Sequence, residues 1–148
     1  MFFYRAGKYS RAAKNAYATV SFSRPTMTQK GKNMEKKEKQ FKKTAEDVTK
    51  RIVPPMGYCL ASDRITVDGL KVGYMYRENP DNDQDSGWRF FAGDEDDVYV
   101  NNPENVDIYD VNTIAHYDNE IIPFLEAPCD TAFGRDENGI FVEEELIL

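Results

Sequence analysis

The chain has 148 residues, of which 41% are hydrophobic and 13% aromatic, so it can bury one core and form a single domain. Its net charge of −7 is unevenly placed: residues 1–52 contain 14 Lys/Arg and 4 Asp/Glu, whereas residues 53–148 contain 5 Lys/Arg and 22 Asp/Glu. Such an acidic body repels phosphate backbones, which argues against nucleic-acid binding, and it attracts basic protein surfaces or cations. No apolar run approaches the roughly 18 residues that span a bilayer, which argues against a membrane protein.

Two cysteines, Cys59 and Cys129, are too few for a disulfide framework, and neither lies in a C-x-x-C pair. The sequence offers only a weak secretory signal. We therefore expect free thiols in a reducing, cytoplasmic compartment.

Residues 1–33 are basic, contain no acidic residue and include many serines and threonines. A secretory signal is the weakest interpretation of this stretch, because its apolar part is short and interrupted. A transit peptide fits the composition better, and we favour an upstream in-frame extension with Met34 as the natural start. In each case we expect residues 1–33 to be disordered and to lie outside a single acidic domain of residues 34–148.

Residues 34–52 have the period of an amphipathic helix. One face would be apolar, because its residues recur at helical spacing: Phe41, Ala45, Val48 and Ile52. Pro54 and Pro55 would end this helix. The apolar stripe is narrow, so we expect the helix to pack on the protein's own sheet, with membrane-surface binding as the less favoured alternative.

Alternating apolar residues predict three strands in the centre of the chain. Gly57–Thr66 would be the first, and Asp68-Gly69 would turn it into a hairpin with Leu70–Arg77. Trp88–Ala92 would pair with the second strand across the acidic loop Asn79–Gly87. Because this third strand alternates, Trp88 and Phe90 would face opposite to Phe91, so one set faces away from the core unless both faces of the sheet are covered.

The C-terminal third predicts short helices and a last hairpin. Val106–Tyr109 is either a short strand or a lead-in, and Asp110–Leu125 predicts two helices, the first capped by Asn112 and the second by Asp118-Asn119. Asn138-Gly139 would join two final strands, Thr131–Phe133 and Ile140–Val142, and residues 143–148 would be a frayed tail. The fold class is therefore α+β, a small antiparallel sheet with an N-terminal amphipathic helix and short C-terminal helices packed on it.

The acidic loop invites comparison with a calcium site, because Asp81, Asp83 and Asp85 alternate. It does not match an EF-hand: Ser86 stands where the glycine belongs, and Ala92 stands where the bidentate glutamate belongs. A looser calcium site and a solvated loop that keeps the sheet soluble both remain open. We predict no cofactor.

A second acidic run follows directly: Asp94, Glu95, Asp96 and Asp97. No histidine is nearby, so this run does not suit a transition metal, and an exposed acidic surface that docks a basic partner fits better. Trp88 between the two acidic segments is either an interface anchor or core, and core is the better single interpretation.

The sequence offers little for catalysis. His116 is the only histidine, and no glycine elbow precedes Cys59 or Cys129, so a thiol nucleophile is disfavoured. The chain also contains no glycine-rich phosphate loop, serine elbow or zinc pattern. We predict a protein that is not an enzyme.

Several segments resemble a bacterial domain family of unknown function, catalogued as the immunity-protein-33 group of polymorphic toxin systems. The blocks are VGYMYRE (72–78), DSGWRFFAGDEDD (85–97) and IYDVNTIAHYDNEIIPFLEAP (108–128), flanked by CLASDRI (59–65) and FGRDENGIF (133–141). The resemblance covers about residues 55–142. It implies a cytoplasmic protein that binds and neutralises a cognate toxin, and it supplies no catalytic residues.

Our leading hypothesis is therefore an immunity protein that docks an acidic surface on a basic toxin. Its expected contact residues are Asp81, Asp83, Asp85, Trp88, Asp94, Glu95, Asp96 and Asp97. The alternative is a regulatory module that binds Ca²⁺ or a small molecule through the Asp81–Asp85 loop.

Overall fold

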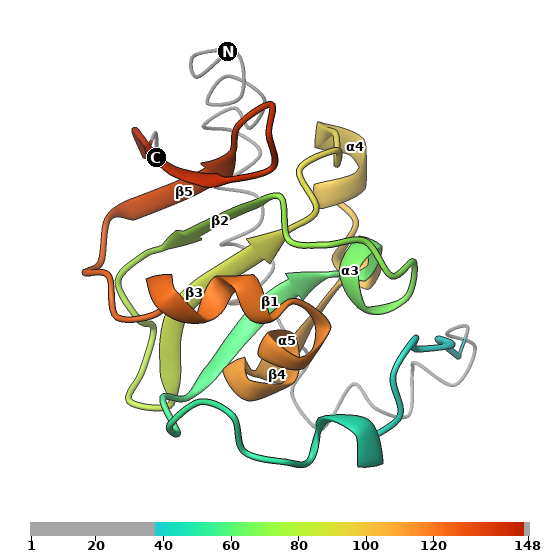
Figure 1. Ribbon diagram of the computed structural model, residues 1–148. Coiled ribbons are helices and arrows are strands. Elements are labelled where there is room, and N and C mark those ends of the chain that lie inside the picture. The colour runs from blue at the N-terminus through green and yellow to red at the C-terminus, as the bar shows by residue number, and fades with distance from the viewer. Residues whose placement is uncertain (1–37, 147–148) are drawn as a thin grey trace.

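A computed structural model describes residues 38–146 and places them in one six-stranded sheet covered by short helices (Figure 1). The strand order is β4-β1-β3-β2-β5-β6. β1 and β3 are parallel and every other neighbouring pair is antiparallel. The sheet is therefore mixed, where the sequence predicted an antiparallel one. The strands are β1 Tyr58–Ser62, β2 Tyr74–Arg77, β3 Asp85–Phe91, β4 Val106–Asp110, β5 Thr131–Arg135 and β6 Phe141–Glu144.

Short helices connect the strands, and most of them pack on one face of the sheet. They are η3 Glu46–Val48, α3 Asp63–Thr66, α4 Asp97–Val100, η4 Pro103–Asn105, α5 Val111–Tyr117 and η5 Asn119–Phe124. α3 and α5 lie on the same side of the sheet in Figure 1, whereas α4 lies beyond the end of β3. None of the helices within residues 38–146 is long and apolar enough to cross a membrane.

Both faces of the central strands are buried, which explains how β3 can carry large aromatic side chains on both sides. Trp88 and Phe90 join the core under α3, α5 and η5. Phe91 points the other way and packs with Tyr74 and Tyr76 in a second cluster. The rings of Phe91 and Tyr76 stack with centroids 6.0 Å apart. All seven residues of β3 are therefore buried, because the strand is covered on both sides.

The predicted pairing of β2 with β3 across the acidic loop is confirmed, with Tyr74 opposite Phe91 and Arg77 opposite Trp88. The predicted hairpin at Asp68-Gly69 is wrong, because β1 pairs with β3 and β4 instead. Ser62 ends β1 by accepting a hydrogen bond from Arg64 N–H at 3.0 Å, which caps α3. Gly69, at φ +82°, then closes that helical turn, so the Asp-Gly pair serves a helix end.

The helix predicted for residues 34–52 is wrong over its described part. Residues 38–53, the strap, run irregularly across the body with a single 3₁₀ turn, η3. The strap's backbone bonds to the body: Lys42 N–H donates to Thr66 O at 2.9 Å, and Asn112 Oδ1 accepts from two strap N–H groups at 2.8 and 3.1 Å. These long-range bonds replace the local bonds of a helix. Residues 34–37, like residues 1–33, lie outside the described residues.

The C-terminal predictions are largely confirmed. Val106–Asp110 is a strand, and Asp118 caps the second helix by accepting from Glu120 N–H at 3.1 Å. Asp110 caps α5 where the sequence suggested Asn112. β5 and β6 form the expected hairpin, with Gly139 at φ +80° in its turn. The prediction that residues 143–148 form a frayed tail is wrong at Glu143 and Glu144, which belong to β6.

Candidate functional site

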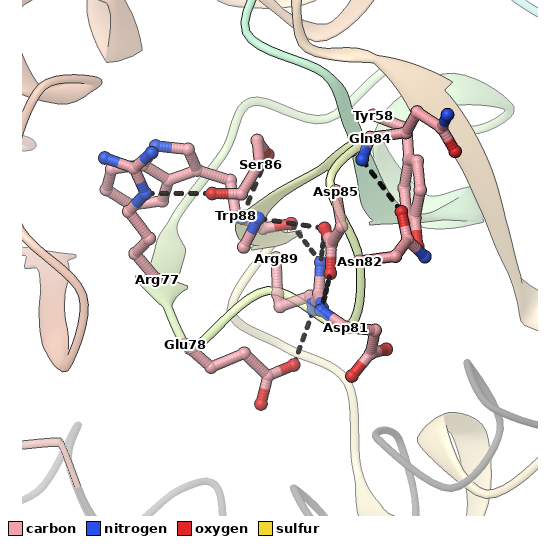
Figure 2. Close-up of polar contacts among 11 residues, drawn as sticks. Tyr58, Arg77, Glu78, Asp81, Asn82, Gln84, Asp85, Ser86, Trp88 and Arg89 are labelled. Carbon is pink, nitrogen blue, oxygen red and sulfur yellow. Dashed lines mark hydrogen bonds and ion pairs between the residues drawn. The ribbon is translucent and has the colours of Figure 1, made fainter.

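A buried group of charges lies under the acidic loop between β2 and β3 (Figure 2). Arg89 has no solvent exposure and donates to both oxygens of Asp85, at 2.9 and 2.8 Å. Its Nε donates to Glu78 Oε2 at 2.6 Å. Asp85 also accepts from the N–H groups of Gly87 at 2.8 Å and Asp81 at 2.9 Å. The loop is thus tied at both ends to one guanidinium.

The two carboxylates on Arg89 differ in their pKa shifts. For Asp85, burial opposes ionisation, but hydrogen bonds from Arg89 and from the backbone outweigh it and lower the pKa. For Glu78, burial is the dominant influence and raises the pKa, with Arg89 offsetting only part of it. Asp85 therefore stays ionised to lower pH than Glu78, and it compensates the positive charge of Arg89 over the wider pH range.

The outer part of the loop is polar and exposed. Asn82 organises it: its Nδ2 donates to Tyr58 OH at 3.0 Å, and its Oδ1 accepts from Gln84 N–H at 2.9 Å. Asp81 and Asp83 are exposed, whereas Asp85 is 5% exposed and turned inward. The alternating carboxylates therefore do not converge, and among residues 38–146 no group of three His, Cys, Asp or Glu side chains could hold a metal ion. The geometry removes the support for a calcium loop.

The second acidic run, residues 94–97, also contains one buried and three exposed carboxylates. Glu95 is 2% exposed and accepts from the N–H groups of Ala92 and Gly93 at 2.8 and 2.9 Å. Asp96 caps α4 by accepting from Tyr99 N–H at 2.8 Å. Asp94 forms an ion pair with Arg64. The exposed members of this run are Asp94, Asp96 and Asp97. They lie on the turn whose backbone N–H groups bind the buried Glu95.

The two acidic segments lie at opposite ends of β3. The strand has seven residues, so they are about 20 Å apart at roughly 3.3 Å per residue. The eight predicted contact residues therefore do not form one surface. We call Asp81 and Asp83 the loop end, and Asp94, Asp96 and Asp97 the α4 end. Asp85, Trp88 and Glu95 are buried and contribute to neither surface.

Each acidic end borders a shallow groove. At the α4 end a groove of about 720 Å³ lies between residues 70–73, 92–94 and 135–139. Arg135 at its edge donates to Val72 O at 2.7 Å and forms an ion pair with Asp118 at 2.8 Å. At the loop end a groove of about 680 Å³ lies between residues 55–58, 83–84 and 108–110. Exposed aliphatic side chains also occur at both ends: Leu70 and Val98 at the α4 end, and Ile108 at the loop end.

Trp88 is a core residue. It has no solvent exposure, its Nε1 donates to Leu125 O at 3.1 Å, and Arg77 lies 5.8 Å from its ring centre. The sequence reasoning missed the roles of Arg89 and Glu78. The signal was a lone arginine in an otherwise apolar, aromatic strand, because a buried guanidinium needs carboxylate partners.

Cys59 and His116 each take part in the packing of the described residues. Cys59 is fully buried in β1, and burial raises the pKa of its thiol. His116 contacts Lys50 O at 2.6 Å through its Nε2 and so takes part in holding the strap.

Comparison with known families agrees with the resemblance seen in the sequence. The model of the Immunity protein Imm33 domain matches residues 59–145, which is more than half of the chain. No curated protein and no solved structure gave a significant match. The match spans β1 to β6 and leaves out the strap. The chain belongs to the Imm33 immunity protein domain family.

Proposed function

We propose that this protein is a non-enzymatic immunity protein that binds a cognate protein toxin and neutralises it by occlusion. Family membership supports a toxin-immunity role. The binding mechanism rests on one observation: some carboxylates are buried and others are exposed. Asp85 and Glu95 are buried and bind backbone N–H groups of the two turns, so these turns hold the exposed carboxylates in fixed positions. Preorganised charges of one sign accelerate association with a partner of the opposite sign.

We place the toxin contact at the α4 end. Val98 is 80% exposed there and directly follows the exposed Asp96 and Asp97, so an apolar side chain lies next to exposed carboxylates. Leu70, 40% exposed, adds apolar surface in the adjacent groove. Protein interfaces commonly combine an apolar centre with a polar rim. The fitting partner surface is basic at its edge and apolar at its centre.

The test starts with capture of a partner from native lysate by the full chain at low salt. Co-expression of that partner with this protein must then protect cells from growth arrest. The binding surface is located with the double variant Asp96→Asn/Asp97→Asn, in which the side-chain amide oxygen introduced at position 96 can still cap α4. The matched control, Asp81→Asn/Asp83→Asn, removes the same charge from the loop end.

At about 0.2–1 kcal/mol for each exposed charge pair, the α4-end variant should weaken binding roughly 2- to 30-fold. The loop-end variant should change it less. The weakening should appear mainly in the association rate and should shrink as salt rises. If affinity for the partner is flat between low and high salt, or if only the loop-end variant weakens it, the proposed surface is incorrect. A captured partner whose toxicity is unchanged by co-expression would refute the neutralising function itself.

A further inference from the structure

The strap, residues 38–53, is held on the body by hydrogen bonds to its backbone. The Thr66 carbonyl of α3 accepts from Lys42 N–H at 2.9 Å, and the Tyr117 hydroxyl of α5 accepts from Lys43 N–H at 3.1 Å. Asn112, also in α5, accepts from two strap N–H groups and donates to two strap C=O groups, at 2.8 to 3.2 Å. Bonds to main-chain groups do not depend on the side chains of the bound segment. This part of the body can therefore bind a chain of different sequence.

Two charged contacts add selectivity for basic side chains. Lys39 lies 2.9 Å from Asp63 of α3 and 3.4 Å from Asp107 of β4. Arg51 donates to both oxygens of Asp110, at 3.2 and 3.0 Å. We call the groups that hold the strap the strap-binding surface, which comprises Asp63, Thr66, Asp107, Asp110, Asn112 and Tyr117. Its three carboxylates bind a segment with five Lys/Arg and three Asp/Glu, so opposite charges meet.

The strap has little apolar anchoring. Val53 is the only buried residue of the segment, and Phe41 and Ile52 remain 46% and 37% exposed. Segments with few buried apolar contacts open locally at a low cost in free energy, without unfolding of the core. The strap can therefore leave its surface while the sheet stays folded.

The family match separates the strap from the surface beneath it. The matched residues, 59–145, begin after the strap and include all six members of the strap-binding surface. Pro54 and Pro55 lie between the strap and β1, and both are exposed. The strap-binding surface is thus part of the family domain, whereas its occupant is an attached segment.

We propose that the strap-binding surface is a second toxin contact, which takes a basic segment of the toxin, and that the strap is its intramolecular competitor. This inference rests on the proposed function, because it names the toxin as the source of that segment. The surface adjoins the α4 end, since Arg64, next to Asp63 in α3, forms an ion pair with Asp94. A toxin bound at the α4 end can therefore extend a basic segment onto α3 and β4. A tethered strap acts at roughly millimolar effective concentration, so it lowers the affinity for a competing segment until it is released.

Binding of a synthetic peptide tests the competition. The probe has the sequence of residues 38–53, carries a fluorescent label and heavy isotopes, and is titrated into the full chain. Lys39→Ala/Arg51→Ala weakens the tethered strap but leaves the strap-binding surface intact, so this variant should bind the probe about 2- to 30-fold more tightly than the unmodified protein. The matched control is Lys42→Ala/Lys43→Ala, which removes the same charge from strap side chains that form no ion pair within residues 38–146. It should change the affinity less than about twofold.

Hydrogen exchange of the protein, read by mass spectrometry, locates the bound probe, because the heavy isotopes distinguish the probe from the strap. At saturation the amides of Lys42, Ile52 and Val53 should exchange roughly fivefold faster or more, since the probe displaces the strap, whereas the amides of β3 should not change. No binding to Lys39→Ala/Arg51→Ala would overturn the proposal. So would binding that leaves strap exchange unchanged, or an equal gain in affinity in the control. If Lys39→Ala/Arg51→Ala does not fold, saturation of the unmodified protein with the probe decides by the same exchange measurement.

The partner captured from lysate separates this inference from the proposed function. A toxin that uses the strap-binding surface should speed exchange of the strap amides as the probe does. If the toxin is neutralised while the strap amides stay protected, the inference is wrong and the proposed function stands. If the probe displaces the strap but co-expression gives no protection, the proposed function is wrong, and the strap-binding surface takes a basic segment from a protein other than a toxin.

Discussion

Removing the negative charge of Asp85 should destabilise this protein more than removing any exposed carboxylate. Asp85→Asn keeps the shape of the side chain but leaves the buried Arg89 with Glu78 as its single carboxylate partner. An asparagine also cannot accept from both guanidinium nitrogens and from the N–H groups of Asp81 and Gly87 at once.

The magnitude follows from the burial of the pair. Arg89 is fully buried and Asp85 is 5% exposed, so the substitution leaves a guanidinium undercompensated in the interior. Loss of one partner of a buried ion pair costs about 3–5 kcal/mol. A domain of this size has a free energy of unfolding of about 5–15 kcal/mol, so this loss is a large share of it.

The pH dependence has a defined sign. The lowered pKa of Asp85 means that its contribution is fully present above the unfolded pKa of about 3.9 and is lost as pH falls through the lower folded pKa. For Glu78 the folded pKa is raised, so the stability that its protonated form contributes is fully present below the unfolded pKa of about 4.3 and is lost as pH rises through the higher folded pKa. At pH 7 Glu78→Gln should therefore cost less than Asp85→Asn.

Urea unfolding, followed by tryptophan fluorescence, measures these differences because Trp88 is the only tryptophan and is buried. Asp83→Asn is the matched control: it makes the same chemical change two residues away on an exposed side chain, and it should change the free energy of unfolding by less than about 0.5 kcal/mol. The reasoning fails if Asp85→Asn costs less than about 1 kcal/mol at pH 7, or if Asp83→Asn costs as much.

Two further predictions concern backbone contacts. Asn112 bonds four backbone groups of the strap, so Asn112→Ala should lower the free energy of unfolding by about 2–4 kcal/mol and speed hydrogen exchange in residues 48–53; unchanged exchange there would contradict its role. Gly87→Ala would place a Cβ 2.3 Å from Glu78 O at φ +87°, so it should cost more than 2 kcal/mol, whereas Gly139→Ala, at φ +80° with nothing within 4 Å, should cost about 1 kcal/mol. Equal losses in thermal melts of the two glycine variants would show that the close approach is unimportant.

Sequence periodicity succeeded where local pattern and tertiary environment agree. β2, β3 and the last hairpin were predictable because alternating apolar residues flank turn formers. The parallel pairing of β1 with β3 was not predictable from the Asp68-Gly69 signal, because the same dipeptide that turns a hairpin also closes a helical turn. The helix prediction for the strap was wrong for a different reason. The strap's hydrogen-bond partners, such as Asn112, lie about 60 residues away in the chain and are not visible in the local pattern.

The acidic segments show why charge alone does not identify which carboxylates are exposed. In Asp81, Asp83 and Asp85 the composition is uniform, yet Asp85 is turned inward by an arginine that lies four residues further on. Glu95 is drawn inward by two N–H groups of the turn that precedes it, while its neighbours stay exposed. Within each run, the acidic residues themselves do not distinguish the buried member. Only the three-dimensional positions of Arg89 and of the β3–α4 turn do so.

The separation of buried from exposed carboxylates predicts that stability and partner binding can be changed independently by different substitutions. Asp85→Asn should lower the free energy of unfolding by about 3–5 kcal/mol, yet at temperatures where the variant is folded its partner affinity should change less than twofold, because the residue is buried about 20 Å from the α4 end. Asp96→Asn/Asp97→Asn should do the reverse, with an unchanged urea midpoint and a weaker, less salt-dependent association. Paired measurements of unfolding and binding on the same preparations decide the matter. If both variants lose stability and affinity in proportion, the exposed acids are structural, and the toxin contact lies elsewhere on the molecule.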